Sequence, residues 1–439
     1  MVLHRVHFLY IFAITLLFCY ISILQHDDKV TVFSQSMSSS ENNNFHQDSH
    51  KKPKILVWKP PWNNFPNGII PLKYCYPNDD CEIELGNGFF GPSSNQMNEA
   101  DAIVMLPLWG KGPSTFTQTI GTLEKLRKSG KLMIFFMMES NYYDFNRKVQ
   151  HNFLTKNQID FSMTFRSDSS FPYPYGTLVS SKMMAFRNKF PEDFEHRVLT
   201  TDEINKFYKT HIDDVFRIGK SQGAISLVSN CEGYHRGEVI TFFDKYFNWK
   251  NGTKALDVFG KCRKKYQPEV SQIRLENTKH ISQTRHQQDA ALISRYYFVL
   301  AFENSNCTDY ITEKFFAHAY MSGTVPVVMG QPRTVYEKLA PGESFVHIDD
   351  FGGDWAGLVK YLQKFIGNEE EYRKQFFAWV DEEKVDPNVK FQSIEELADG
   401  YGFCKLCKTL KSRRVDFSAA DVLKHENADS WWNNKTCES

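Results

Sequence analysis

Short apolar runs alternate with segments of helical spacing along most of this chain. In its first half, such runs occupy residues 54–58, 100–108 and 131–140, and residues 119–131 carry a helical pattern that ends at Gly130. Short apolar runs bounded by turn residues are typical of buried strands, and glycine commonly follows the last turn of a helix. Strands separated by helices predict a parallel α/β domain.

A second series of the same kind begins after residue 215, and no internal sequence repeat links it to the first. Its expected members are strands at 223–230, 255–260, 295–304 and 324–330, and a helix at 236–247.

We therefore expect two α/β domains, at residues 54–210 and 211–400, with their junction in the region 205–218. The remaining segment, 401–439, contains three cysteines and two tryptophans. Because these side chains are usually buried or paired, we expect this segment to fold back against the two domains.

The N-terminus has the pattern of a membrane anchor. Residues 8–24 are uncharged and apolar, with Arg5 before them and Asp27 and Asp28 after them. The positive flank predicts a lumenal C-terminal part. A cleaved signal peptide is the alternative, but no small-x-small cleavage site follows, which favours a retained anchor.

Residues 1–7 would then form a cytoplasmic tail, and the polar residues 25–53 a disordered stem. The short span suits the thinner membranes of the early secretory pathway. We therefore expect a single-pass type II protein of the Golgi membrane whose catalytic portion is lumenal.

The charge of the chain is balanced, with 52 basic and 52 acidic residues among 439. No overall field draws such a protein to nucleic acid, so an anionic ligand must be bound by local cations. One of the nine cysteines, Cys19, lies in the predicted anchor, which leaves eight to pair in an oxidising lumen. Cys404 and Cys407 have the spacing of a redox or zinc motif, but no second such pair occurs, and structural disulfides are expected instead.

Polar side chains stand at the end of one expected strand and at the start of the following helix. Glu303 and Asn304 end the strand, while Glu313 and Lys314 open the helix. In parallel sheets, ligands bind beyond the carboxyl ends of the strands, and helix N-termini there favour anions. We expect Lys314 to neutralise a phosphate, and Asn304, Tyr310 and Glu313 to hydrogen-bond ribose or sugar hydroxyls. The alternative is that Glu313 and Lys314 only occupy an exposed first turn.

Two further candidates stand near the carboxyl ends of expected strands. Arg236 opens the helix after residues 223–230, and its planar guanidinium suits a diphosphate because it bonds two oxygens at once. Glu139 ends the run 131–140, where burial would raise its pKa and fit it to act as a general base toward a hydroxyl. Ordinary surface positions near helix starts are the alternatives for both. The loop 165–177 either offers aromatic side chains to a sugar ring or is simply a turn.

Several separated motifs together resemble the α-1,3-fucosyltransferase family. FENSNCTDYITEKFF followed by GTVPVVMG resembles its donor-site signature, and MMES, SMTFRSDSSFPYPYG, VSNC and DVFGKC match its other landmarks in order. The resemblance extends over residues 54–410. It implies an α/β fold of the GT-B type, in which two Rossmann-like domains face each other across a cleft. The first would mainly recognise the acceptor and the second would hold GDP-fucose.

The resemblance also implies roles for single residues. Glu139 matches the catalytic base, and Arg236 and Lys314 match the diphosphate-binding cations. The remaining donor contacts that it implies are Asn304, Tyr310 and Glu313.

The implied reaction is inverting: the 3-hydroxyl of an N-acetylglucosamine attacks the anomeric carbon of GDP-β-L-fucose from the face opposite GDP. Glu139 would take the hydroxyl proton, while the cations stabilise charge on the departing diphosphate. No Asp-x-Asp triplet occurs, so no metal site and no required cofactor are expected, and stimulation by Mn²⁺ stays open.

The donor motif is most similar to the invertebrate and plant branch, which modifies the Asn-linked N-acetylglucosamine of N-glycan cores. A distal-core or Lewis-type acceptor is the alternative. Expected partners are GDP-fucose, an N-glycan or glycoprotein acceptor and the membrane, but not nucleic acid; dimerisation through stem or anchor stays open. A noncatalytic lumenal glycan-binding protein and a transferase of another nucleotide sugar are the remaining alternatives.

The sequence contains N-glycosylation sequons at Asn251, Asn306 and Asn434, which fit passage through the secretory pathway. Asn306 lies within the expected donor loop, where a glycan would crowd GDP-fucose, and its neighbour Cys307 is expected to form a disulfide. We therefore expect the Asn306 sequon to be unoccupied.

Overall fold

The computed structural model describes residues 52–58, 74–75, 81–86, 93–105, 125–126, 128–140, 159–231, 233–268, 285–381, 389, 393–415, 431–432 and 437–438. The predicted cytoplasmic tail at 1–7 and anchor at 8–24 lie outside these residues, as do residues 25–51 of the predicted stem. None of the described helices is both long enough and apolar enough to cross a bilayer.

The first sheet of the described chain contains β1 (Lys54–Val57), β2 (Glu82–Leu85), β3 (Ala102–Met105), β4 (Leu132–Met137) and β5 (Phe161–Thr164). The strand order is β2-β1-β3-β4-β5, and every neighbouring pair is parallel. The inner strands are apolar and buried along nearly their whole length, as is typical of a sheet covered on both faces. The edge strand β2 is more polar and is partly exposed.

The second sheet contains β6 (Gln222–Leu227), β7 (Leu256–Phe259), β8 (Tyr296–Phe302), β10 (Val325–Met329) and β11 (Val346–His347). These strands are also parallel, in the order β11-β10-β8-β6-β7. In each sheet, the first strand in sequence lies between the second and the third. Both sheets therefore have the doubly wound order 2-1-3-4-5, in which the direction of winding reverses between the first and third strands.

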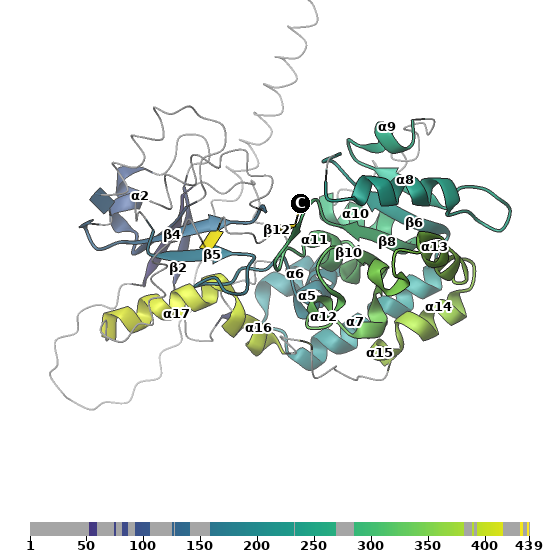
Figure 1. Ribbon diagram of the computed structural model, residues 1–439. Helices are drawn as coiled ribbons and strands as arrows, with labels where there is room; N and C mark the ends of the chain where they lie inside the picture. The colour runs from purple at the N-terminus through teal and green to yellow at the C-terminus, as the bar shows by residue number, and fades with distance from the viewer. Residues whose placement is uncertain are drawn as a thin grey trace, which may run out of the picture. The chain divides into compact units, whose positions relative to one another are not determined.

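Helices connect these strands and follow the last of them (Figure 1). They are α2 (Ser94–Glu99), α5 (Leu178–Lys189), α6 (Pro191–His196), α7 (Thr201–Ile218), α8 (Arg236–Tyr246), α9 (Arg263–Tyr266), α10 (Arg285–Ile293), α11 (Glu313–Phe316), α12 (Arg333–Tyr336), α13 (Trp355–Gln363), α14 (Glu369–Phe376), α15 (Ala378–Asp381), α16 (Ile394–Gly400) and α17 (Gly402–Val415). The junction that we predict at 205–218 falls within α7, which begins with a capping box between Thr200 and Glu203 and ends before Gly219.

The two faces of the first sheet have separate apolar cores. Because side chains alternate along a strand, Ile134 and Phe136 of β4 enter one core, and Met133 and Phe135 enter the other. Residues of α16 and α17 complete the first of these cores, which brings the end of the chain back to the first sheet (Figure 1). The second core is closed by side chains from distant segments, namely Phe165, Cys307, Tyr310 and Trp432.

Disulfides connect all eight cysteines other than Cys19. The pairs are Cys75–Cys404, Cys81–Cys407, Cys231–Cys262 and Cys307–Cys437. Cys404 and Cys407 therefore bond two different segments near the first sheet and not each other, which confirms the expected structural disulfides. The fourth disulfide joins the two-residue strands β9 (Asn306–Cys307) and β12 (Cys437–Glu438), which pair antiparallel.

The strands predicted from the short apolar runs are confirmed in both halves of the chain. Three strands of the two five-stranded sheets were missed, and each has a local reason. β2 alternates acidic with aliphatic residues, β5 is a four-residue FSMT segment, and β11 has only two residues. Such segments are too short or too polar to show a clear strand pattern. Of the helix predicted at 119–131, only part is described, and Gly130 there has the expected positive φ of 85°.

The buried ammonium group of Lys220 fastens one end of the second sheet. Its Nζ donates to the carbonyl oxygens of Ser294, Tyr296 and Gly323 at 3.0, 3.0 and 2.9 Å. We expect Lys220→Met to lower the free energy of unfolding by about 3 kcal/mol, because buried carbonyls would lose their donors. Urea denaturation measures this change. The matched control is Lys206→Met, at an exposed position of α7. An equal decrease in the free energy of unfolding in the two variants would contradict the stabilising role of Lys220.

Candidate active site

The reversal of winding in the second sheet lies between β6 and β8, and Arg236 stands at this point. Its Nη1 donates to the carbonyl of Phe302, the last residue of β8, at 3.4 Å. Its Nη2 donates to the carbonyl of Asn230, which follows β6. Only 2% of Arg236 is exposed. The guanidinium thus spans the carboxyl ends of the two strands between which doubly wound sheets bind their ligands.

The loop before α8 packs closely on Asn304. The amide of Tyr234 donates to the Asn304 carbonyl at 3.0 Å, and a Cβ on Gly233 would lie 3.0 Å from that oxygen and 3.2 Å from Arg236 Nε. His235, at the N-cap of α8, has a left-handed φ of 43°, which is uncommon outside glycine. These constraints bring Asn304 and Arg236 together, as the sequence predicts for residues at one edge of a sheet. Sequence reasoning missed Gly233.

A buried acid organises the start of α11. Glu303, with 4% of its surface exposed, accepts from the Thr312 amide at 2.8 Å, the Thr312 hydroxyl at 2.9 Å and Lys314 Nζ at 3.0 Å. Lys314 also donates to Glu313 Oε1 at 3.1 Å. Lys314 is therefore positioned between two carboxylates, whereas the sequence-based interpretation gave it a phosphate as partner and foresaw neither carboxylate.

These contacts set the charges of the cluster. Burial raises the pKa of Glu303, an effect that Lys314 opposes. Burial also disfavours the charged form of Lys314, but Glu303 and Glu313 outweigh it and raise the pKa of Lys314 further above its ordinary value. For Glu313, Lys314 and His318 overcome the effect of burial and lower its pKa to about 2. Lys314 and Glu313 are both charged at neutral pH.

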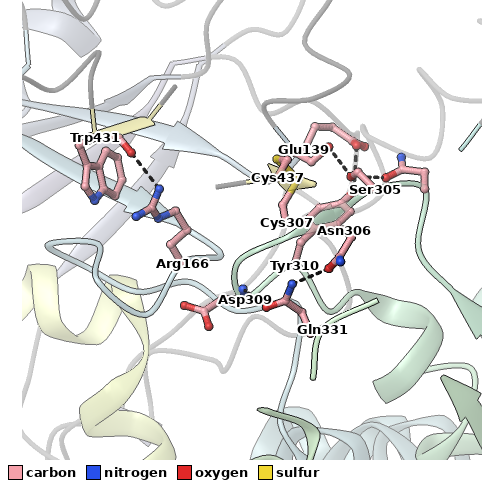
Figure 2. The surroundings of a disulfide bond; sticks show 12 residues. Glu139, Arg166, Ser305, Asn306, Cys307, Asp309, Tyr310, Gln331, Trp431 and Cys437 are labelled. Carbon is pink, nitrogen blue, oxygen red and sulfur yellow. Dashed lines mark hydrogen bonds between the residues drawn. A yellow bond between two sulfur atoms is a disulfide. The ribbon is translucent and has the colours of Figure 1, made fainter. Parts of the chain in front are cut away.

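Glu139 follows β4 of the first sheet and is joined to Tyr310 of the second half of the chain. Tyr310 Oη donates to Glu139 Oε2 at 3.1 Å (Figure 2). Burial is the largest influence on the Glu139 carboxyl and raises its pKa, while the Tyr310 hydrogen bond lowers it; Glu313 and Glu303 raise it, and Lys314 lowers it. The net shift is upward, in the direction that suits a general base.

A second contact joins the same two segments, between Ser140, which follows Glu139, and Ser305, which precedes Tyr310. The Ser305 hydroxyl lies 2.7 Å from Ser140 Oγ and 2.9 Å from Asn304 Oδ1. A short chain of hydroxyl and amide groups therefore links the neighbour of Glu139 with Asn304.

The six predicted site residues fall into three groups of contacting residues. Arg236 lies with Asn304, Lys314 with Glu313, and Glu139 with Tyr310.

The aromatic loop after β5 does not present Tyr173 to a sugar. Its ring is 1% exposed and packs edge-on against Phe136 and Tyr401. Tyr175 is partly buried, and its hydroxyl donates to the Met138 carbonyl at 2.5 Å. Both rings support the sheet and the residues next to Glu139, so of the two alternatives for this loop, Tyr173 does not favour a sugar-binding surface.

The arrangement offers a partly buried carboxylate and cations at the carboxyl edge of a doubly wound sheet. Such a set can remove a proton from a hydroxyl and stabilise a negatively charged leaving group. Among the described residues, no group of three or more His, Cys, Asp or Glu side chains is placed to hold a metal ion.

Comparison with known proteins agrees with this picture. Residues 50–176 match the family described as fucosyltransferase, N-terminal, and residues 218–426 match glycosyltransferase family 10 (fucosyltransferase), C-term. Fold and site thus define an α/β glycosyltransferase. Within that class, the chain belongs to glycosyltransferase family 10, the fucosyltransferases, which confirms the family predicted from the motifs.

Individual relatives support the assignment over most of the chain. The α-(1,3)-fucosyltransferase fut-5 of Caenorhabditis elegans is 27% identical over 394 residues, which cover 89% of this chain and 85% of the relative. The glycoprotein 3-α-L-fucosyltransferase A of Drosophila melanogaster is 25% identical over 93% of this chain and 66% of its own. The human α-(1,3)-fucosyltransferase 7 is 48% identical, over 21% of this chain and 26% of its own.

Two sequons differ in their accessibility. Asn251 is exposed in a turn, where its Oδ1 accepts from the Thr253 amide at 3.0 Å. Asn306 is 6% exposed, lies in β9, and its Oδ1 accepts from Gln331 Nε2 at 2.7 Å. Asn434 lies outside the described residues.

We expect folded protein from a eukaryotic secretory host to carry a glycan on Asn251 and none on Asn306, because a glycan cannot fit within the pairing of β9 with β12. Glycopeptide mass spectrometry with and without glycosidase treatment measures both occupancies. Extensive glycosylation of Asn306 in active protein would contradict the observed placement of this loop.

Proposed function

We propose that this enzyme transfers L-fucose from GDP-β-L-fucose to the 3-hydroxyl of an N-acetylglucosamine in an N-glycan. The family membership supports fucose as the transferred sugar, and the α-(1,3) linkage in the names of the relatives supports the 3-hydroxyl. The observation that carries the proposal is the position of Glu139, which is joined through Tyr310 to the loop that also contains Asn304 and Lys314.

The donor is proposed to bind at the carboxyl edge of the second sheet, in a GT-B arrangement whose first domain receives the acceptor. The strand order supports this location, because Arg236 and Asn304 follow the two strands between which winding reverses. Arg236 and Lys314 would bind the diphosphate, Asn304 and Glu313 would bind other groups of the donor, and Tyr310, which donates its proton to Glu139, would contact the donor only as a hydrogen-bond acceptor. Lys314 is suited to the role because it carries its charge at neutral pH.

Glu139 is proposed as the general base of an inverting displacement. The acceptor hydroxyl attacks the anomeric carbon of fucose, the bond from that carbon to the GDP oxygen breaks, and the hydroxyl proton moves to the Glu139 carboxylate. The raised pKa of Glu139 strengthens it as a base. The two cations stabilise the charge that develops on the diphosphate.

The acceptor is proposed to be the Asn-linked N-acetylglucosamine of the N-glycan core, with a distal-core or Lewis-type residue as the second candidate. The similarity to a relative named glycoprotein 3-α-L-fucosyltransferase favours a glycoprotein acceptor. The stretch of 48% identity to the human α-(1,3)-fucosyltransferase 7 is the observation that keeps the second candidate. A lumenal location in the Golgi and the N-terminal anchor belong to the same proposal.

Glu139→Gln tests the proposed base. It keeps the shape of the side chain but cannot take a proton, so we expect kcat to fall about 10²- to 10⁴-fold with little change in the KM for GDP-fucose. The measurement is transfer from GDP-fucose to an N-glycan core glycopeptide and to N-acetyllactosamine, side by side. The matched control is Glu370→Gln, at an exposed position of α14.

Transfer to the core glycopeptide alone, lost only in Glu139→Gln, would support both base and acceptor. Transfer to lactosamine alone would preserve the mechanism and replace the acceptor. Wild-type rates in Glu139→Gln would remove Glu139 as the base.

Lys314→Met tests the proposed phosphate contact. We expect the Kd for GDP, measured by calorimetry, to rise about 10- to 100-fold, because a charge-assisted hydrogen bond is lost. Since this change leaves Glu303 buried without its cation, the double variant Glu303→Gln/Lys314→Met provides a control in which the pair is neutral. Wild-type affinity for GDP in the double variant would contradict a role for Lys314 in donor binding.

A further inference from the structure

The turn that carries Tyr310 is held from several sides (Figure 2). Cys307 is bonded to Cys437, and its carbonyl accepts from the Tyr310 amide at 3.0 Å. Between them, Asp309 has a left-handed φ of 60°. Its carboxylate accepts from the amide and hydroxyl of Ser167, after β5, at 2.9 and 2.7 Å. The backbone beside Tyr310 is therefore tied both to the C-terminus and to the first sheet.

The C-terminal strap, defined as Trp431, Trp432, Cys437 and Glu438, completes this arrangement. Arg166 Nη1 donates to the Trp431 carbonyl at 2.8 Å, and its guanidinium lies 4.7 Å from the centre of the Trp431 ring (Figure 2). Trp432 is 1% exposed and packs edge-on against Phe135 of β4. The strap thus contacts the first sheet through its tryptophans and the Tyr310 turn through its disulfide.

Tyr310 itself is almost completely enclosed, with 3% of its surface exposed. Its ring packs edge-on against Phe165 at 4.9 Å and Tyr175 at 6.0 Å between ring centres. Phe165 in turn contacts Trp432, at 5.9 Å. The ring has little freedom to turn, so its hydroxyl is directed at Glu139 Oε2.

We propose that Tyr310 is a positioning residue for the base Glu139, and that the C-terminal strap holds Tyr310 in place for this task. This inference rests on the proposed function of Glu139. A tyrosine hydroxyl has one proton to donate, and here the proton goes to Glu139 Oε2. That bond orients the carboxylate and leaves Oε1 to take the proton of the acceptor hydroxyl.

The hydrogen bond also favours the ionised form of Glu139, the form that acts as a base. The other described titratable groups that act on Glu139 are Glu303, Glu313 and Lys314, and Tyr175 lies beside them. Of these groups, Tyr175 hydrogen-bonds Tyr310 and loses that bond in Tyr310→Phe, but burial raises the pKa of Tyr175 and keeps it neutral throughout the acid limb, so a shift of that limb reports the lost bond to Glu139.

Tyr310→Phe keeps the packed ring and removes the hydroxyl. The acid limb of the kcat/KM–pH profile follows the ionisation of Glu139. Loss of the hydrogen bond from Tyr310 to the ionised carboxylate raises the pKa of Glu139 and moves this limb to higher pH. We expect a shift of about one pH unit, with kcat/KM about tenfold lower on the acid side. The matched control is Tyr208→Phe, which removes the buried bond from Tyr208 Oη to the Tyr320 carbonyl and should leave the limb in place.

The strap is tested by Cys307→Ser/Cys437→Ser, which removes the disulfide without leaving an unpaired thiol. We expect the acid limb to shift in the same direction as in Tyr310→Phe, and to shift no further when the two changes are combined. The control is Cys81→Ser/Cys407→Ser, which removes a disulfide from the opposite core of the first sheet. Thermal unfolding of each variant shows whether it is folded.

The outcomes separate this inference from the proposed function. If Glu139→Gln transfers fucose at the wild-type rate, the proposed base is wrong and the inference fails with it. If Glu139→Gln is inactive but Tyr310→Phe has the wild-type profile, or loses activity equally at every pH, the function stands and the positioning role is overturned. Additive shifts of the limb in the combined variant would overturn the role of the strap alone.

Discussion

A carboxylate that leaves water needs hydrogen-bond donors or a nearby cation, and two carboxylates in this enzyme show how that requirement shapes the site. Glu303 is enclosed at the end of β8, and Thr312 and Lys314 fold over it. Glu139 is partly enclosed at the end of β4 and receives a hydroxyl from Tyr310. The first requirement fixes the segment from Glu303 to Lys314 on its own sheet, and the second joins this segment to the first half of the chain.

The different partners give the two acids different chemistry. Lys314 supplies a full positive charge to Glu303, so that pair has a structural role and keeps the lysine ionised. Tyr310 supplies only a neutral donor to Glu139, whose pKa stays above its ordinary value. A carboxylate that is oriented but not neutralised by a cation can take a proton from a substrate hydroxyl. In the proposed reaction, Glu139 has this role toward the acceptor hydroxyl.

Much of the fold could be predicted from local pattern, but the assembly of the site could not. The apolar runs gave the strands that carry Glu139 and Asn304, because buried parallel strands are apolar on both faces. The strand order, which explains why Arg236 and Asn304 meet, depends on pairing that local pattern does not encode. The bond between Tyr310 and Glu139 spans 171 positions, and no periodicity connects residues so far apart. The role of the loop that contains Tyr173 stayed undecided for a related reason, since an aromatic loop has the same composition whether it faces a sugar or a core.

The most direct test of this account is the titration of Glu139 in purified protein labelled with [¹³Cδ]glutamate, followed by ¹³C NMR and assigned by the resonance that Glu139→Gln removes. The account predicts a midpoint above the ordinary value of 4.5, because burial outweighs the hydrogen bond from Tyr310. A midpoint at or below 4.5 would contradict it, since hydrogen bonds and charges would then stabilise the ionised form of Glu139 by at least as much as burial destabilises it.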